Sequence, residues 1–225
     1  MCKKYELTNE STRISYGGIK GSKLKLYRIK ALRDFGDVKA GDLGGFVQSE
    51  VNLSHDGNAW IYDSAMVYDN AKISGNAEVR NIANVYADAR VYGNAIVQGR
   101  GARVCGNAQV FDNAVVCDSA WVIHNAKVYG DATICDSAWV GRDARVYGDA
   151  QLLDEAYIGG SAEIFEYAII YDKAKVYGNA KVYGDATVYN KARVYGDAML
   201  YGNADVSDNT IVCGRTMTGN TIYIF

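Results

Sequence analysis

Two polar side chains near the middle of the chain have the chemistry needed for proton transfer and anion binding. His124 lies in the run Ile123-His-Asn125, and Arg142 follows eighteen residues later. A neutral imidazole can take a proton from an attacking hydroxyl or amine, and a guanidinium can bind phosphate or carboxylate. The simpler interpretation of both is a polar residue at a bend of the chain. Whether these two residues do chemistry or only occupy bends depends on the elements that carry them.

The surrounding chain consists of one six-residue unit repeated in tandem. Between Ala174 and Asp197 the unit reads roughly A-x-V-Y-G-[ND]. Alanine fills the first slot at every sixth residue from Ala102 to Ala204, and the block 59–97 follows the same pattern one residue out of phase. An internal repeat of fixed period takes precedence over other signals of fold.

This period predicts a solenoid. Side chains alternate along a strand, so the alanine and the aliphatic third slot face inward while the second and fourth slots face outward. The following Gly-Asn or Gly-Asp suits a bend in which one residue has positive φ. Three units then complete an eighteen-residue coil, and each coil bonds to the next at about 4.8 Å. We predict an all-β, single-stranded parallel β-helix of about nine coils, because a period of six does not fit an α-helix.

One outward row of this solenoid combines large rings with very small neighbours. Because residues eighteen apart stack, two tryptophans and a tyrosine form a row beside an isoleucine and two glycines. This pattern predicts a ridge next to a groove, and an exposed apolar patch of that kind usually marks an interface. We predict self-association through this surface, with small-ligand binding as the alternative. The predicted binding residues are Trp121, Ile123, Trp139, Gly141, Arg142, Tyr157 and Gly159.

A second outward row is expected to form a continuous ladder of stacked rings. We interpret the ladder as intramolecular stabilisation. A face that binds a partner or single-stranded nucleic acid is the alternative, although the near-neutral charge argues against nucleic acid. The ladder residues are Tyr92, Phe111, Tyr129, Tyr147, Phe165, Tyr183 and Tyr201.

The cysteines and the second histidine give weaker chemical signals. Cys117 and Cys135 fall on adjacent coils, where a disulfide is the alternative but side chains point alike, and we expect free thiols in a reducing compartment. His55 is expected to belong to a terminal cap. The odd number of cysteines, without paired close spacing, argues against a zinc cluster. Two histidines are too few for a three-histidine zinc site, so we predict no metal.

Residues 1–58 lack the repeat, and we expect them to form a small β-rich cap. Alternating stretches near both ends of this segment predict strands, and the glycine-rich segment 36–45 lacks the spacing of a phosphate-binding loop. A solenoid needs a covered first coil, because an open end invites edge pairing. We divide the chain into the cap, the β-helix at 59–212 and a closing segment at 213–225, with a strand expected at Thr221–Phe225.

The repeat resembles the hexapeptide repeat of left-handed parallel β-helices, which is best known from acyltransferases that use acyl-CoA or acyl carrier protein. The resemblance implies the left hand and a donor such as acetyl-CoA or another acyl-CoA. Ile123-His-Asn125 is similar, at His124, to the setting of the catalytic histidine in the lipid A-type enzymes. Such enzymes usually carry an extended loop, whereas the repeat is interrupted here by one extra residue near Gly99–Gly101.

The segment before the repeat points to a narrower group. The run Leu32–Val47, together with Ala59–Asp63, resembles the head of the YdcK-like hexapeptide-repeat proteins of bacteria and their phages. Those proteins are often labelled as transferases without an established reaction, so the resemblance implies no catalytic residue. A phage-encoded member could act on a host protein.

Composition limits the partners without naming one. The 225 residues carry a net charge of −2, which favours neither nucleic acid nor membrane. No apolar run is long enough to span a bilayer, and Met1–Lys4 lacks the apolar part of a secretion signal, so we expect a cytoplasmic protein. The absence of proline suits a body made of backbone ladders.

Two functions follow. The first is a non-enzymatic module that needs no cofactor and self-associates as a dimer or trimer. Its aromatic faces would bind a host protein, another partner protein or a ligand. The alternative is an acyl-CoA-dependent O- or N-acyltransferase with His124 as general base. The regularity of the repeat favours the first, because catalysis normally breaks local rules somewhere.

Overall fold

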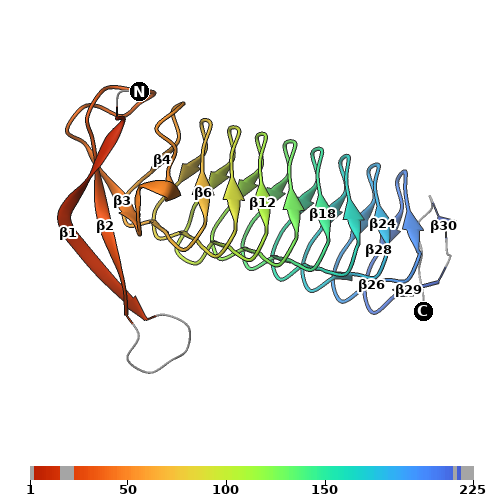
Figure 1. Ribbon diagram of the computed structural model, residues 1–225. Helices are drawn as coiled ribbons and strands as arrows, with labels where there is room; N and C mark the ends of the chain where they lie inside the picture. The colour runs from red at the N-terminus through yellow and green to blue at the C-terminus, as the bar shows by residue number, and fades with distance from the viewer. Residues whose placement is uncertain (1–2, 16–22, 215–216, 219–225) are drawn as a thin grey trace.

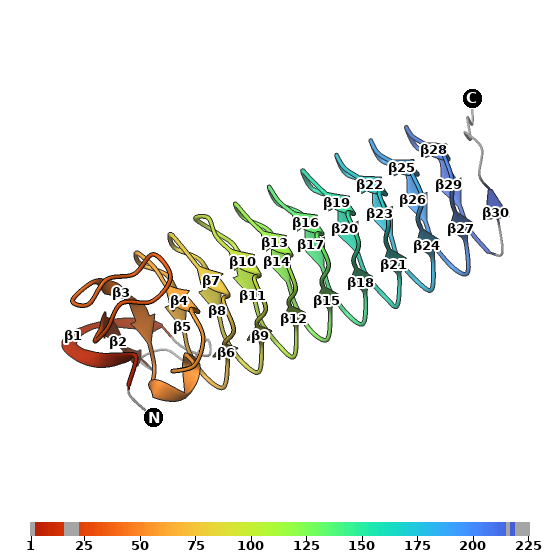
Figure 2. The ribbon, with the colours of Figure 1, turned by 90° about the horizontal axis from the view of Figure 1, so that it is seen from above.

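The computed structural model describes residues 3–15, 23–214 and 217–218, which form a long parallel β-solenoid with a β-rich structure across its first coil (Figure 1). Its strands lie in one sheet of twelve and two sheets of nine. Seen from above, about nine coils follow one another along a single axis (Figure 2). The predicted all-β solenoid is thus confirmed. No helix in the described ranges is long and apolar enough to cross a membrane.

Two of the three sheets are named here for the side chains that distinguish them. The tryptophan sheet continues from the cap into β5 (Met66–Val67), β8 (Asn84–Val85), β11 (Arg103–Val104), β14 (Trp121–Val122), β17 (Trp139–Val140), β20 (Tyr157–Ile158), β23 (Lys175–Val176), β26 (Arg193–Val194) and β29 (Ile211–Val212). The cysteine sheet contains β4 (Trp60–Ile61), β7 (Glu78–Val79), β10 (Ile96–Val97), β13 (Val115–Val116), β16 (Thr133–Ile134), β19 (Gln151–Leu152), β22 (Ile169–Ile170), β25 (Thr187–Val188) and β28 (Asp205–Val206).

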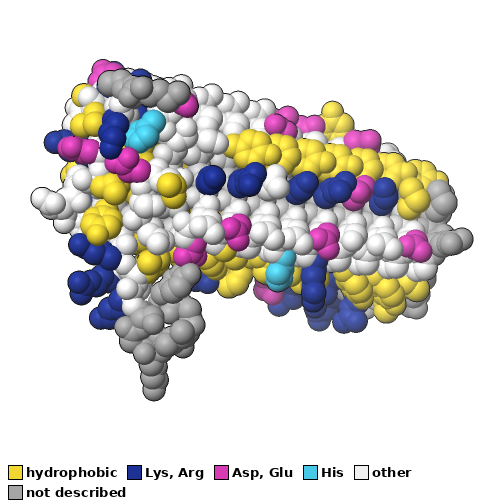
Figure 3. Space-filling view, in the orientation of Figure 1, with side chains coloured by type: hydrophobic (Ala, Val, Ile, Leu, Met, Phe, Trp, Pro, Cys, Tyr) yellow, Lys and Arg dark blue, Asp and Glu magenta, His cyan; other side chains and the backbone are white. Residues whose placement is uncertain are grey.

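The third sheet, the ladder sheet, carries the predicted row of stacked rings. It contains β6 (Lys72–Ile73), β9 (Arg90–Val91), β12 (Gln109–Val110), β15 (Lys127–Val128), β18 (Arg145–Val146), β21 (Glu163–Ile164), β24 (Lys181–Val182), β27 (Met199–Leu200) and β30 (Met217–Thr218). Successive rings from Tyr92 to Tyr201 lie 4.7–5.8 Å apart between centroids. Hydrophobic side chains form a continuous band along this sheet, with Lys and Arg side chains beside it (Figure 3). The predicted ladder is therefore confirmed.

The core is the inward column of alanines and aliphatic residues that the repeat predicts. Ala138 and Val140 are fully buried, as are their equivalents in the neighbouring coils. Burial of one valine side chain contributes about 1.5–3 kcal/mol, so the narrow core gains its stability by repetition. Coils are joined by backbone hydrogen bonds between residues about eighteen apart, such as Trp121 N–H to Ala138 C=O at 2.9 Å.

The bends use the left-handed backbone region, as predicted. Corner residues other than glycine have φ between 52° and 62°, a conformation that Asn and Asp tolerate better than most residues. The extra residue near Gly99–Gly101 lies in the bend between β10 and β11, and Ile96 still pairs with Val115. The insertion therefore lengthens one coil, but the strands on either side keep the same residues pointing inward and outward.

The N-terminal residues cover the first coil. Strands β1 (Tyr5–Ser15) and β2 (Lys23–Ala31) pair antiparallel, and β3 (Leu43–Val47) joins β2 to β5 of the tryptophan sheet. A Cβ on Gly45 would lie 2.5 Å from the carbonyl oxygen of Ala65, so glycine is what lets β3 approach the coil this closely. The 3-10 turn η1 (Glu50–Asn52) follows.

Two further expectations concern the two ends of the chain. His55 stacks on Tyr5 with ring centroids 4.4 Å apart, and its Nδ1 accepts the backbone N–H of Lys4, so His55 lies among the N-terminal cap residues. The strand expected at Thr221–Phe225 lies outside the described residues.

Candidate functional site

The predicted site residues lie on three successive coils of the tryptophan sheet. Strands β14, β17 and β20 pair in parallel, with Trp121 opposite Trp139 and Trp139 opposite Tyr157. The structure therefore brings together the row that the eighteen-residue spacing predicts. It places His124 and Arg142 at the corners that follow β14 and β17.

The rings of this row make different contacts. Trp139 and Tyr157 stack with centroids 4.6 Å apart and planes 5° from parallel. Trp121 is 37% exposed, and the guanidinium of Arg103 lies 4.5 Å from its ring centroid. A cation over an indole face is attracted by the ring quadrupole, so the aromatic row continues into a cation at its N-terminal side.

The predicted groove beside the row is filled by the rings. A Cβ built on Gly141 would meet the Trp139 indole at 2.3 Å, and one on Gly159 would meet the Tyr157 hydroxyl at 2.8 Å. The two rings thus fold over the glycines instead of standing beside an open channel, because this position buries apolar surface that an upright ring would expose. The predicted ridge and groove is therefore wrong, and the surface is an aromatic strip bordered by Ile123.

His124 has a structural partner in the next coil. It sits at φ 61°, and the backbone N–H of Arg142 donates to its Nδ1 at 3.3 Å. Carboxylates make the same bond at other corners, where each accepts the backbone N–H of the corner one coil further on. The carboxylates that accept this bond belong to Asp63, Asp69, Asp112, Asp136, Asp154, Glu166 and Asp172.

The acceptor role of Nδ1 determines what His124 can do chemically. An imidazole nitrogen that accepts a hydrogen bond carries no proton, so neutral His124 holds its proton on Nε2. The nitrogen left facing outward is then a donor, whereas a general base must present a free lone pair to its substrate. The ring also packs edge-on against Trp139, at 6.0 Å between centroids. This arrangement matches a corner residue better than a base.

A thiol near the aromatic strip is chemically quiet. Cys105 lies one coil before Ile123 in the same outward slot and is half-buried. Burial raises the pKa of the Cys105 thiol. Because the thiolate is the reactive form, this cysteine is a poor nucleophile near neutral pH.

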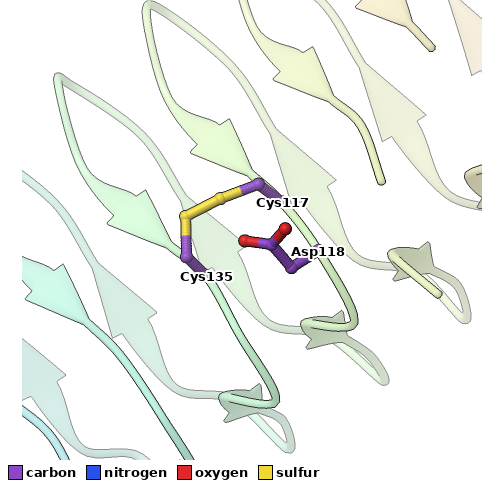
Figure 4. Close-up of side chains that lie close together, drawn as sticks. All are labelled: Cys117, Asp118 and Cys135. Atoms are coloured by element: carbon purple, nitrogen blue, oxygen red, sulfur yellow. A yellow bond between two sulfur atoms is a disulfide. The ribbon is translucent and has the colours of Figure 1, made fainter. Parts of the chain in front are cut away.

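The expectation of free thiols at Cys117 and Cys135 is wrong in this structure, which joins the two residues by a disulfide (Figure 4). Their Cα atoms are 4.6 Å apart, within the range that disulfides span. The sequence argument treated the common direction of the two side chains as an obstacle, whereas the short separation of stacked coils is sufficient. The carboxylate of Asp118 lies within 4.8 Å of both sulfur atoms. Metal binding there would need thiolates, so the bonded pair offers no such site.

Sequence reasoning missed a group of cations on the same sheet. Lys173, Lys175, Lys191 and Arg193 line one groove beside β23, β26 and β29. The sequence spacing could have revealed this group. Lys173 lies eighteen residues before Lys191, and Lys175 lies eighteen residues before Arg193. Counting net charge over whole segments concealed this group, because the acidic residues of the same segment outnumber its cations.

Comparisons with known proteins bear on the solenoid body. The family model described as the YdcK beta solenoid repeat matches residues 89–100, 102–118, 126–142 and 180–196. A stretch of 63 residues, 27% of this chain, is 44% identical to the "Uncharacterized acetyltransferase YdcK" of Escherichia coli (strain K12). That match covers 19% of the length of the relative, which is itself described as uncharacterized. The chain is therefore similar, over part of its solenoid, to the YdcK β-solenoid proteins.

Proposed function

We propose that the protein is a non-enzymatic interaction module whose tryptophan sheet mediates self-association and the binding of a partner protein or ligand. The observation that supports it is the in-register strip of Trp121, Trp139 and Tyr157 on the outside of a rigid solenoid. Tryptophan and tyrosine are enriched among the residues that dominate interface energies. A flat strip built on strands loses little entropy on binding, because its rings are already held by their neighbours.

The corner role of His124 supports the same proposal. Its Nδ1 serves the backbone of the next coil, as carboxylates do elsewhere in the chain. Because this hydrogen bond between coils accounts for His124, no catalytic role is needed to explain the residue. In this proposal the protein acts in the cytoplasm as a dimer or trimer, and a phage-encoded form would bind a host protein.

The second candidate function is acyl transfer from acetyl-CoA or another acyl-CoA. It is favoured by the printed name of the relative, which contains the word acetyltransferase, and by the position of His124 beside Trp139. In this function His124 would have to release the N–H of Arg142 and reverse its tautomer before it could act as base. That requirement makes it the weaker of the two.

Sedimentation velocity over a concentration series tests the interaction module. We expect the wild type to associate, and Trp121→Ser to raise the dissociation constant about tenfold or more, as loss of an interface hot spot does. Tyr201→Ser is the matched control, because Tyr201 is also 37% exposed but lies on the ladder sheet. A wild type that stays monomeric throughout, or equal effects of both substitutions, would contradict self-association through this strip.

A further inference from the structure

The cationic groove at the C-terminal half of the tryptophan sheet has the properties of an anion site. It encloses about 410 Å³ and is lined by Lys173, Lys175, Lys191 and Arg193, together with Asn209 and Ile211. All four cationic residues are exposed. A volume of this size is in the range of small-molecule sites.

The solenoid arranges these cations in a regular pattern. Lys175 pairs in register with Arg193 on the next strand, so their backbones are about 4.8 Å apart. Lys173 and Lys191 precede them by two residues on the same two coils, which separates the two rows by no more than about 7 Å of chain. The four residues therefore occupy the corners of a small rectangle along the backbone.

Within the described chain these charges are largely uncompensated. Lys175, Lys191 and Arg193 have no carboxylate within 4.0 Å there, whereas Lys173 pairs with exposed Glu155 at 3.4 Å. Asp172 and Asp208 line an adjoining groove with Lys173 and Lys191, so the positive charge is least compensated at Lys175 and Arg193. Crowded like charges repel one another, and an anion between them would relieve that repulsion.

On the ladder sheet, by contrast, cations are paired with a carboxylate. Glu163 lies between Arg145 and Lys181 in register, with salt bridges of 3.7 Å and 3.0 Å. On the tryptophan sheet Glu155 precedes Lys173 in its row, whereas the row of Lys175 and Arg193 has no acid, since Tyr157 precedes it and Ile211 follows it. The contrast indicates that the excess positive charge is local to this groove.

A second groove adjoins the first and shares two of its cations. It measures about 450 Å³ and is lined by Tyr157, Gly160, Lys175, Tyr177, Gly178 and Arg193. The tyrosines and the glycines offer apolar surface and exposed backbone beside the positive charges. A ligand with an anionic part and an organic part would fit the two grooves together.

We propose that this groove binds a small molecule that carries two or more linked phosphate groups. Arg193 can hold one phosphate by a bidentate contact, while the lysines act as point charges that suit several oxygen positions. A single phosphate would engage one side of the rectangle, whereas linked phosphates engage both rows of cations. The site adjoins the association strip at Tyr157, which lines the second groove, whereas its four cations lie further along the chain.

Calorimetry with inorganic tripolyphosphate and orthophosphate at constant ionic strength tests the proposal. We expect tripolyphosphate to bind at least about tenfold more tightly than orthophosphate. The double variant Lys175→Gln/Arg193→Gln should weaken tripolyphosphate binding about tenfold or more, and Lys191→Gln should weaken it to a smaller degree. These side chains are exposed, and circular dichroism would verify that the variants keep the wild-type fold.

The matched control is Lys72→Gln/Arg90→Gln, which removes the same charge from another in-register Lys–Arg pair beside a groove on the ladder sheet. This control should bind tripolyphosphate like the wild type. Equal weakening in both double variants would overturn the proposal, since it would show a diffuse effect of net charge. Absence of tripolyphosphate binding would also overturn it. So would binding of an oligothymidylate, but not tripolyphosphate, through the same cations, because the surface would then be one for nucleic acid.

Discussion

His124 illustrates how a side chain with catalytic chemistry can belong to the backbone instead. It occupies a corner at positive φ and accepts the N–H of the next corner, a bond that aspartates such as Asp136 make at equivalent positions. The corner slot selects for a short or planar acceptor that tolerates the left-handed conformation. Histidine meets both conditions, so its presence needs no substrate.

Substitution of His124 separates the two roles. Aspartate should preserve the acceptor, so His124→Asp should change the free energy of unfolding by less than about 0.5 kcal/mol. His124→Ala removes the acceptor at the same backbone angle and should cost about 1 kcal/mol. Urea unfolding of the two variants beside the wild type measures both values.

Acetyl-CoA calorimetry on the same three proteins supplies the functional arm. The corner role predicts that any heat with acetyl-CoA is the same for all three proteins. Heat that saturates in the wild type and disappears in His124→Ala and His124→Asp would establish His124 in a donor site and contradict the structural role. An unfolding energy that falls equally in both variants would likewise contradict the acceptor argument.

At the scale of elements, the cap is joined to the first coil by a buried cation. Lys4 is fully buried, and its Nζ donates to the carbonyl oxygen of Ala59 at 2.8 Å. Burial, with a smaller contribution from Arg33, lowers the pKa of Lys4 from 10.5 to about 8. The charged form is thus less favourable in the folded cap than in the unfolded chain.

This difference predicts that stability rises with pH through the alkaline range. Below pH 8 both states hold the proton and the folded state bears the full cost of the buried charge. Between pH 8 and 10.5 the unfolded chain binds more protons, so the free energy of unfolding increases, by about 3 kcal/mol at most. Melting temperatures from pH 7 to 9.5 should rise for the wild type relative to Lys4→Met.

The comparison has to end below pH 10, because the pKa of Tyr5 is raised by burial. A neutral tyrosine in the fold and an ionised one in the unfolded chain give the opposite slope at higher pH. Parallel melting curves for the wild type and Lys4→Met from pH 7 to 9.5 would show that Lys4 keeps its ordinary pKa.

At the scale of the whole molecule, one covalent link restricts the unfolded chain. The bond between Cys117 and Cys135 closes a segment with a sequence separation of 18, and a loop near that length contributes about 3 kcal/mol through lost chain entropy. Reduction or Cys135→Ser should lower the free energy of unfolding in urea by roughly that amount.

Cys105→Ser is the control for this measurement, since Cys105 forms no disulfide. It should leave the effect of reduction intact. If reduction leaves the unfolding midpoint of the wild type unchanged, the two sulfurs are not bonded in solution and the original expectation of free thiols is restored.

The parts of the molecule that were predictable are those governed by the period. The strand register and the columns headed by Trp121 and Tyr92 follow from the repeat, because strand alternation and coil length leave no other arrangement. The rest depends on rotamers and local partners. The indole of Trp139 folding over Gly141, and Nδ1 of His124 facing a backbone N–H, are choices among side-chain conformations that spacing does not distinguish.

The constant coil length also governs how such a chain can change in evolution. Loss or duplication of eighteen codons anywhere between Ala102 and Val212 would shorten or lengthen the rod by one step and leave every downstream column on its own face. Loss of six codons between Trp139 and Lys175 would instead carry each downstream residue to the neighbouring face, so that Lys175 would leave the line of Trp139. Recombination within this gene can therefore vary the reach of the molecule while keeping its surfaces, provided that it works in whole coils.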